Sequence, residues 1–308
     1  MATKTSPEPS AGASASLLPA APRAGAFLVA KAAALDEALA LAEPRVLGNT
    51  DSEAVHDLRV ALRRLRTLLK LARPVFGAFH TDAVRQGFAD LQTSTGDLRD
   101  EEALESTLAD LGMGHAPFVA WRERRRARER RLRRSLVVHL RQGELARARA
   151  LLTALLLLPI RPDRDPPLSK FARKMVQKAQ RGVESRRDTP ADNVVGLHDL
   201  RIAYKKLRYA VEIFSAALPA DLAAMAEPAA RFQKRLGDIH DLDVAKLALA
   251  RARGLDPQMR QRVLGALDVA RQKKLAKYVA EMTPAEPAPI ATPATQVTKR
   301  APRARSAR

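Results

Sequence analysis

Apolar residues recur along most of this chain at the three- and four-residue spacing of amphipathic helices. The clearest case is Val55, Leu58, Leu62, Leu65 and Leu69, whose intervals of 3, 4, 3 and 4 place them on one side of a helix. Alanine, leucine, arginine and glutamate, which favour helix, dominate the composition, and β-branched runs bounded by turn residues are missing. The pattern predicts an all-α fold of roughly nine or ten helices, each of about ten to twenty-five residues.

Proline and glycine indicate where these helices end. The spacing of Thr50-Asp-Ser-Glu53 is that of a capping box, which predicts the start of the helix that carries the leucine stripe. The predicted stops are Pro44, Gly48, Pro74, Gly77, Gly96, residues 112–117, Gly143, residues 159–167, Pro190, Pro219, Gly237 and Pro257.

Composition divides the chain into four predicted segments. Residues 1–24 are small and proline-bearing, which is typical of a disordered leader, and residues 283–308 form a disordered basic tail. The proline-rich loop at 159–167 separates two helical bundles, residues 25–160 and 161–282. No membrane segment is predicted, because the longest apolar run covers about half of the ~20 residues that a bilayer requires.

Two motifs occur twice, in the same order. His56-Asp-Leu-Arg-Val-Ala-Leu-Arg-Arg-Leu-Arg66 is identical to His198-Asp-Leu-Arg-Ile-Ala-Tyr-Lys-Lys-Leu-Arg208 at seven of eleven positions. Further on, Gly96-Asp-Leu-Arg-Asp100 aligns with Gly237-Asp-Ile-His-Asp241. The two offsets, 142 and 141 residues, are almost equal, which indicates an internal duplication whose halves meet near residue 160.

Each copy of the first motif carries a row of cations beside its apolar stripe, because one residue corresponds to about 100° on a helix. The first ridge is His56, Arg59, Arg63, Arg66 and Lys70, and the second is His198, Arg201, Lys205 and Arg208. Solvated helix faces usually alternate positive and negative side chains, whereas these rows lack such relief except for Glu212 at the end of the second. The duplicated, self-repelling row favours an external polyanion as partner over a solvated face.

The overall charge agrees with a polyanionic partner. The chain has 54 basic and 34 acidic side chains, a net charge of +20, of which the tail from residue 283 carries +4 and the rest about +16. There is no cysteine, which excludes disulfides, thiolate metal sites and cysteine nucleophiles and fits a reducing cytosol. Aromatic residues make up only 4%, which disfavours a reader of single-stranded nucleic acid.

The motifs Val55-His-Asp-Leu-Arg-Val-Ala-Leu-Arg-Arg-Leu-Arg66, Leu197-His-Asp-Leu-Arg-Ile-Ala-Tyr-Lys-Lys-Leu-Arg-Tyr209 and Leu236-Gly-Asp-Ile-His-Asp241 together resemble those of the CHAD family. The resemblance covers nearly all of residues 25–282. It implies two four-helix bundles related by a pseudo-twofold axis, with basic side chains facing a central cleft. It also implies a cytoplasmic protein, associated with polyphosphate granules, that binds inorganic polyphosphate without catalysis.

The resemblance assigns ligand binding to the matching cations of both ridges: His56, Arg59, Arg63, Arg66, His198, Arg201, Lys205 and Arg208. The first glycine–aspartate motif has Thr95 where the second has Leu236, so Arg99, like His240, is a secondary candidate.

Further basic residues are candidates from their positions. Lys70 extends the first ridge, and Lys174 and Lys178 share one face of a helix in the second half, although such a face is often solvated. Arg125 and Arg128 fall at core-facing positions, where they need an anion or a carboxylate unless their stems extend outward.

Catalytic and metal sites are not predicted. The six histidines have no metal-ligand spacing, and phosphate-loop, dinucleotide and serine-hydrolase signatures are absent. We therefore expect no cofactor and no enzymatic activity. The first alternative to polyphosphate binding is binding of a nucleic-acid backbone, which needs only lysine and arginine. The second is a phosphate-transferring or hydrolysing enzyme, which requires an acidic metal-holding cluster.

Overall fold

The structure, a computed structural model, describes residues 21–51, 53–111, 119–252 and 254–282. These residues form helices joined by short connections, and ten of the α-helices have ten or more residues. The elements are α1 (Ala24–Gly48), α2 (Ala54–Phe76), α3 (Ala78–Gly87), α4 (Ala89–Asp110), α5 (Val119–Arg141), α6 (Glu144–Leu157), η2 (Pro162–Arg164), α7 (Leu168–Glu184), α8 (Val194–Phe214), η3 (Ser215–Ala217), α9 (Ala220–Ala223), α10 (Ala226–Ala250) and α11 (Pro257–Met282).

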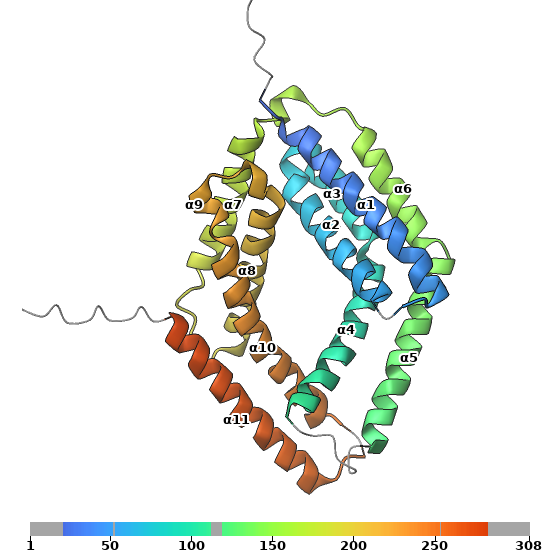
Figure 1. The fold of residues 1–308 in the computed structure, drawn as a ribbon, viewed down its shortest axis with the longest axis vertical. Coiled ribbons are helices and arrows are strands. Elements are labelled where there is room, and N and C mark those ends of the chain that lie inside the picture. The colour runs from blue at the N-terminus through green and yellow to red at the C-terminus, as the bar shows by residue number, and fades with distance from the viewer. Residues whose placement is uncertain (1–20, 52, 112–118, 253, 283–308) are drawn as a thin grey trace, which may run out of the picture.

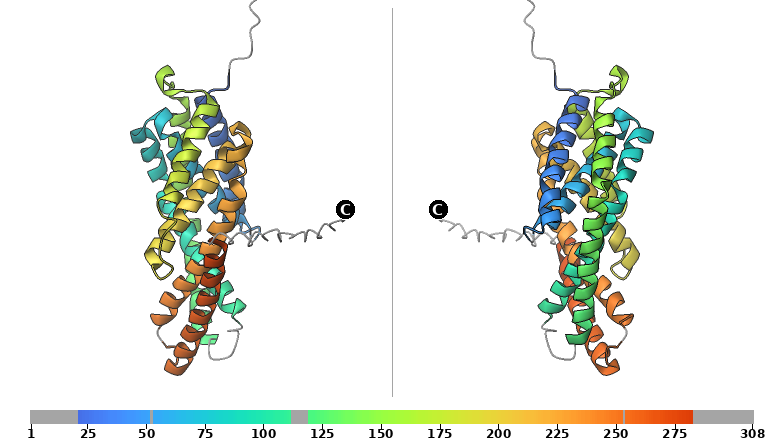
Figure 2. Two further views of the ribbon diagram at one scale, coloured as in Figure 1. Left: turned by 90° about the vertical axis from the view of Figure 1, so that its left-hand side faces the viewer. Right: turned by 90° about the vertical axis from the view of Figure 1, so that its right-hand side faces the viewer.

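The helices are arranged as a flattened frame (Figures 1 and 2). On one side α1, α2, α3 and α6 pack together, and on the other α7, α8 and α9 pack with the first part of α10 (Figure 1). Long helices α4 and α5 descend from the first group, and α10 and α11 form the facing edge (Figure 1). Direct contacts of α2 with α8 and of α4 with α10 join the two sides.

Three clusters of buried apolar side chains hold this frame together. The first lies mainly among α1, α2, α3 and α6 and includes Phe214 from α8, whose ring is 5.6 Å from that of Phe27 and 5.7 Å from that of Phe171. The second joins α7, α8 and α10 with the end of α11. The third is built from α4, α5, α10 and α11 and contains Trp121, so residues from both sides of position 160 share it.

The predicted leucine stripe is the buried face of α2. Leu58, Leu62 and Leu65 are fully buried, and Leu69 is 2% exposed. In α8 the corresponding positions Leu197, Leu200, Tyr204, Leu207 and Val211 are buried as well. The 3.6-residue period therefore fixes how both helices face the core, and with them the direction of the neighbouring cations.

Four predicted helix stops are wrong. Pro44 and Pro74 lie inside α1 and α2, and Gly96 and Gly237 lie inside α4 and α10. The prolines occur in the last turns, where only one or two helical bonds are lost. The two glycines lie in long helices that pack against several neighbouring helices. This tertiary packing outweighs the cost of about 1 kcal/mol that a glycine adds inside a helix.

The predicted capping box is also wrong. The helix begins at Ala54, and Glu53 at the N-cap makes no side-chain hydrogen bond to it. Arg45 organises this corner instead, because its guanidinium donates to Asp51 at 2.8 Å and to Asp57 at 2.7 Å.

The all-α prediction is confirmed, since the described residues contain no strand. The internal duplication and the division at residue 160 stay predictions. The predicted basic tail and most of the predicted leader lie outside the described residues. None of the helices in the described part of the chain has the length and hydropathy to cross a membrane.

Candidate functional site

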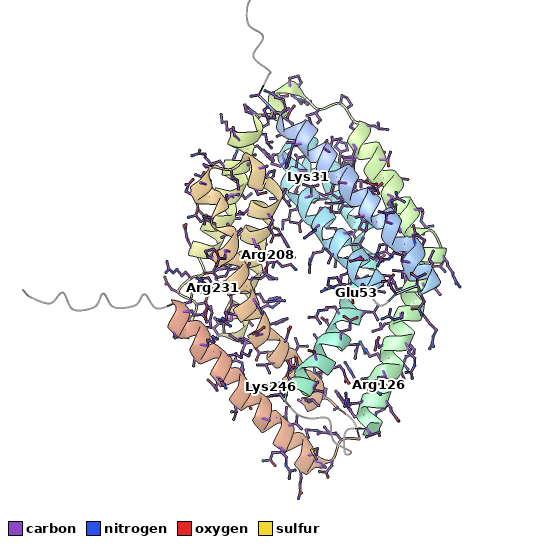
Figure 3. All side chains as sticks on the ribbon, viewed as in Figure 1. Lys31, Glu53, Arg126, Arg208, Arg231 and Lys246 are labelled. Carbon is purple, nitrogen blue, oxygen red and sulfur yellow. The ribbon has the colours of Figure 1, made fainter. Side chains whose placement is uncertain are left out.

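The two cationic ridges lie on α2 and α8, the helices that join the sides of the frame. On α2, Arg59, Arg63 and Arg66 are half-buried, whereas His56 and Lys70 at the ends are exposed. The four ridge residues of α8, His198, Arg201, Lys205 and Arg208, are all half-buried. Side chains from both helices, including Arg208, extend into the space between the two sides (Figure 3).

The middle parts of the ridges meet around Lys205. Burial, together with the positive charges of Arg63, Arg201, Arg59 and Arg208, lowers the pKa of Lys205 to about 8. The influence of Arg59 and Arg63 shows that α2 and α8 bring their cations to one place. We call these five residues, Arg59, Arg63, Arg201, Lys205 and Arg208, the cationic cluster.

The arginines of the cluster have unused hydrogen-bond donors. The Nε atoms of Arg59, Arg63, Arg201 and Arg208 are buried and have no hydrogen-bond partner among the residues that the structure describes. Glu212 Oε1 lies 2.9 Å from Arg208 Nε, but the pair lacks hydrogen-bond geometry. Burial lowers the pKa of Arg59 and of Arg63. The charge of Arg63 lowers the pKa of Arg59 further, and the charge of Arg208 lowers that of Arg63. Each unsatisfied buried donor costs about 1–3 kcal/mol, which an anion that accepts from it would recover.

Tyr209 supports the cluster, a role that the sequence pattern does not predict. Its buried ring lies 4.9 Å from the Arg208 guanidinium and 5.5 Å from that of Arg63. The aromatic face favours both cations and links the two ridges. The one available signal was the place of Tyr209 directly after Arg208 in the second motif.

A cavity of about 520 Å³ opens beside the cluster. Arg201 and Arg208 line it together with residues of α10, which include Gln233. Gln233 Oε1 is buried without a hydrogen-bond partner in the described part of the chain, and Asp238 and Asp241 also line this cavity. The cluster is therefore reachable from this side, past a rim that carries both signs of charge.

Two of the three motif histidines lie together in the structure, and His56 lies apart from them. His198 and His240 are neighbours, with Nδ1 atoms 3.4 Å apart, and burial, Arg201 and His198 lower the pKa of His240. This places the secondary candidate His240 beside the α8 ridge. His56 is exposed and has no ring contact with either histidine among the described residues.

The two glycine–aspartate motifs meet where α4 packs on α10. Burial, Asp97 and Asp241 raise the pKa of Asp100, while Arg59 opposes the rise. The secondary candidate Arg99 lies close enough to Arg59 to lower the pKa of Arg59. The motifs thus place carboxylates at the α4–α10 end of the cluster, a role that the sequence did not reveal.

Lys70 and Lys178 line a different cavity, of about 570 Å³, between α2, α7 and α8. Lys206, Arg73 and Arg186 also line it, and much of the lining is apolar. Lys174 is exposed on α7 and is not part of this lining. Arg66 lies between the two regions, with its backbone oxygen accepting from Arg85 Nε at 3.2 Å.

Arg125 and Arg128 have a carboxylate partner. Both pair with Glu101 of α4, at 2.7 Å and 2.8 Å, and the side chain of Glu101 is only 6% exposed. The anion that the sequence predicts beside these two arginines is therefore Glu101, a residue of the chain itself.

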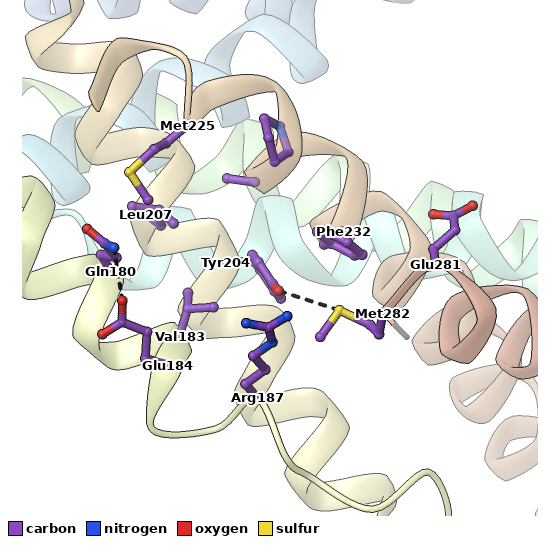
Figure 4. A pocket seen from close by; sticks show the side chains of 12 residues that line it. Gln180, Val183, Glu184, Arg187, Tyr204, Leu207, Met225, Phe232, Glu281 and Met282 are labelled. Carbon is purple, nitrogen blue, oxygen red and sulfur yellow. Dashed lines mark hydrogen bonds between the residues drawn. The ribbon is translucent and has the colours of Figure 1, made fainter. Parts of the chain in front are cut away.

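A third cavity, of about 310 Å³, lies between α7, α8, α10 and the end of α11 (Figure 4). Tyr204 and Phe232 contribute to its lining, and the Tyr204 hydroxyl donates to Met282 Sδ at 3.8 Å. Its charged side chains, Glu184, Glu281 and Arg187, are mixed in sign, so this cavity does not select for an anion. Within the described residues, no group of three histidine, cysteine, aspartate or glutamate side chains is placed to hold a metal ion.

The fold and the cluster define an all-helical protein with a basic centre formed by two arginine-rich helices. The family model of the CHAD domain matches residues 30–250, so the chain belongs to the CHAD domain family.

Two solved structures are similar to the whole fold. The CHAD domain from the plant Ricinus communis has 25% sequence identity and a TM-score of 0.65, and the match covers 85% of this chain and 89% of that one. PptA from Streptomyces chartreusis has 16% identity and a TM-score of 0.61, with 83% and 95% covered, and supports the fold alone. No curated protein matches this chain significantly.

Proposed function

We propose that this protein binds inorganic polyphosphate at the cationic cluster and does not alter it chemically. The observation that carries the proposal is the convergence of five cations, four of which are arginines whose buried Nε donors have no acceptor among the described residues. A chain of phosphates supplies both the missing charge and closely spaced acceptor oxygens, and guanidinium groups match phosphate geometry.

A linear polyanion fits better than a compact one. Arg66 and Arg99 extend the cluster along α2 and α4, and His198 and His240 extend it along α8 and α10. We include these residues, the exposed His56, and Lys70, Lys174 and Lys178 on the α2–α7 side, as further contacts along a bound chain. Arg125 and Arg128 contribute less, because Glu101 already neutralises them in part.

A nucleic-acid backbone is the second candidate, since backbone binding also needs only phosphate contacts. The observation that favours it is the high positive charge of the whole chain. Against it, the aromatic ring within the cluster, Tyr209, is buried against two arginines and offers no surface on which a base can stack. We further propose that the protein acts in the cytoplasm, at polyphosphate granules.

The test is a set of titrations with long-chain polyphosphate, duplex DNA and RNA at one salt concentration. The cluster variant is Arg63→Gln with Arg201→Gln. The matched control is Arg130→Gln with Arg134→Gln, which removes the same charge from exposed positions of α5.

We expect polyphosphate to bind most tightly, and the cluster variant to lose at least about tenfold in affinity while the control loses less than about twofold. Equal losses in both variants would show nonspecific attraction to a basic surface. Tighter binding of DNA or RNA would favour the second candidate.

A further inference from the structure

Lys205 is the one primary amine of the cationic cluster. It lies four residues after Arg201 and three before Arg208, on the same face of α8, and the arginines of α2 approach it from the other side. Its neighbour Lys206 is exposed and lines the other cavity, between α2, α7 and α8. The two adjacent lysines therefore have the same backbone and opposite surroundings.

These surroundings make Lys205 a nucleophile at neutral pH. Only an unprotonated amine has a lone pair with which to attack. Burial beside other cations lowers the pKa of a lysine and so increases the fraction of unprotonated amine. With a pKa of about 8, about a quarter of Lys205 is unprotonated at pH 7.5. An ordinary lysine, with a pKa near 10.4, is unprotonated to about one part in a thousand at that pH.

The arginines around this amine select the reagent. Guanidinium groups bind phosphate through paired N–H donors, and four buried Nε donors of the cluster lack an acceptor within the described residues. A small molecule that carries a phosphate next to an electrophilic carbon would be held with that carbon close to the amine. Acyl phosphates have this structure, because their carbonyl carbon is bonded directly to a phosphate oxygen.

We propose that Lys205 is a site of acylation by small acyl phosphates that the arginines of the cationic cluster recruit. The Nζ lone pair attacks the carbonyl carbon and forms a C–N bond. The C–O bond to phosphate breaks and its electron pair leaves with the phosphate. The amine proton goes to the released phosphate, so the products are an amide and hydrogen phosphate. The guanidinium groups stabilise the charge on the departing phosphate.

Acylation also regulates the cluster. The amide is neutral, so one of the five central charges is lost and the affinity for a polyanion falls. This consequence rests on the proposed function, whereas the acylation itself requires only that the arginines bind phosphate.

The experiment treats the full chain with acetyl phosphate at pH 7.5 and follows acetylation by mass spectrometry. Cleavage before aspartate releases Asp199–Ala220, which contains only the lysines Lys205 and Lys206, so fragment ions compare them within one peptide. We expect Lys205 to react at least fivefold faster than Lys206, and inorganic phosphate to slow Lys205 selectively. In Arg59→Gln with Arg201→Gln, confirmed as folded by circular dichroism, the ratio should fall toward one.

A Lys205 rate equal to or below that of Lys206, or a ratio unchanged in the arginine variant, would overturn the inference. Polyphosphate binding is measured separately on the unmodified protein. Preferential acetylation without polyphosphate binding supports this inference and refutes the proposed function. Tight polyphosphate binding without preferential acetylation of Lys205 supports the proposed function and refutes this inference.

Discussion

At the scale of single residues, the cluster combines charges that repel one another with an environment that keeps them together. Lys205 is the most affected, because burial and four guanidinium groups all favour its neutral form. The Tyr209 ring and the apolar faces of α2 and α8 hold the cations in place without neutralising them. A preorganised site of this kind loses little conformational entropy when an anion binds.

Polyphosphate binding should weaken as pH rises above 8. The free protein loses the Lys205 proton near pH 8, whereas a bound polyanion favours the ammonium form and raises that pKa. The complex therefore holds more protons than the free protein between pH 8 and about 10.4, and affinity falls through this window. Calorimetric titration should show a loss of about tenfold between pH 7.5 and 9.5.

The control for this prediction is Lys205→Arg, which stays charged throughout and should keep nearly constant affinity. Burial, Arg201 and His198 lower the pKa of His240 from an ordinary value near 6.5, which already lies below this pH range. The same pH slope in the variant and in the native protein would contradict the assignment to Lys205.

The helical period predicts the ridges but not everything that surrounds them. The period of α2 and α8 placed Arg63 and Lys205 beside buried leucines, and the structure places them together. Tyr209 and Asp100 were missed because their roles depend on which helices pack against each other. That is a long-range property which a helical period does not contain. The assignment of these residues to polyphosphate stays a proposal.

At the scale of helices, the long edge formed by α10 and α11 carries two ion pairs of different kinds. Arg271 Nε donates to Asp243 at 2.6 Å, and their side chains are only 9% and 16% exposed. Lys246 and Asp268 join the same two helices, but the Asp268 side chain is 54% exposed. Both pairs flank the third apolar cluster, which contains Val263.

Asp243→Asn should destabilise the protein by about 2–4 kcal/mol, because it leaves the buried Arg271 without its counter-ion. Asp268→Asn should cost less than about 1 kcal/mol, because water already screens that pair. Urea unfolding followed by circular dichroism measures both values. Equal costs would mean that burial does not decide the contribution of these pairs.

The helix boundaries show where local sequence signals are overruled. Gly77 has a φ of +89°, which favours glycine, and it ends α2 as predicted. Gly96 and Gly237 were expected to act in the same way but lie inside continuous helices. Local composition cannot distinguish a glycine that ends a helix from one that lies inside a helix, because packing between α4 and α10 keeps the latter helices continuous.

At the scale of the whole molecule, the cluster belongs to both sides of the frame. Arg59 and Arg63 come from α2, and Arg201, Lys205 and Arg208 come from α8, so neither side alone has the site. The third apolar cluster also draws on both sides and fixes their relative position.

One polyphosphate chain should therefore occupy one shared site. Arg59→Gln with Arg63→Gln and Arg201→Gln with Arg208→Gln should each lower affinity by at least about tenfold, with an unchanged stoichiometry of about one chain per protein. Calorimetry with a short, uniform polyphosphate gives both quantities. Two independent sites would instead give a stoichiometry near two, reduced to one in each variant.

Binding should also be strongly salt-dependent, because a polyanion releases condensed counterions when it is neutralised. Log affinity should fall linearly with log salt. The slope should become shallower by about 2 in Arg63→Gln with Arg201→Gln, and should stay the same in Arg130→Gln with Arg134→Gln. Binding that is flat between low and moderate salt would contradict an electrostatic mechanism.

The contact of Tyr209 with two guanidinium groups gives the site an optical signal of its own. The chain has three tyrosines and one tryptophan; Tyr204 and Tyr278 lie in the second apolar cluster and Trp121 in the third. An anion that draws Arg63 and Arg208 toward itself changes the electric field across the Tyr209 ring, the tyrosine that both guanidinium groups contact. Near-ultraviolet circular dichroism in the tyrosine band thus reports occupancy of the cluster without any attached label.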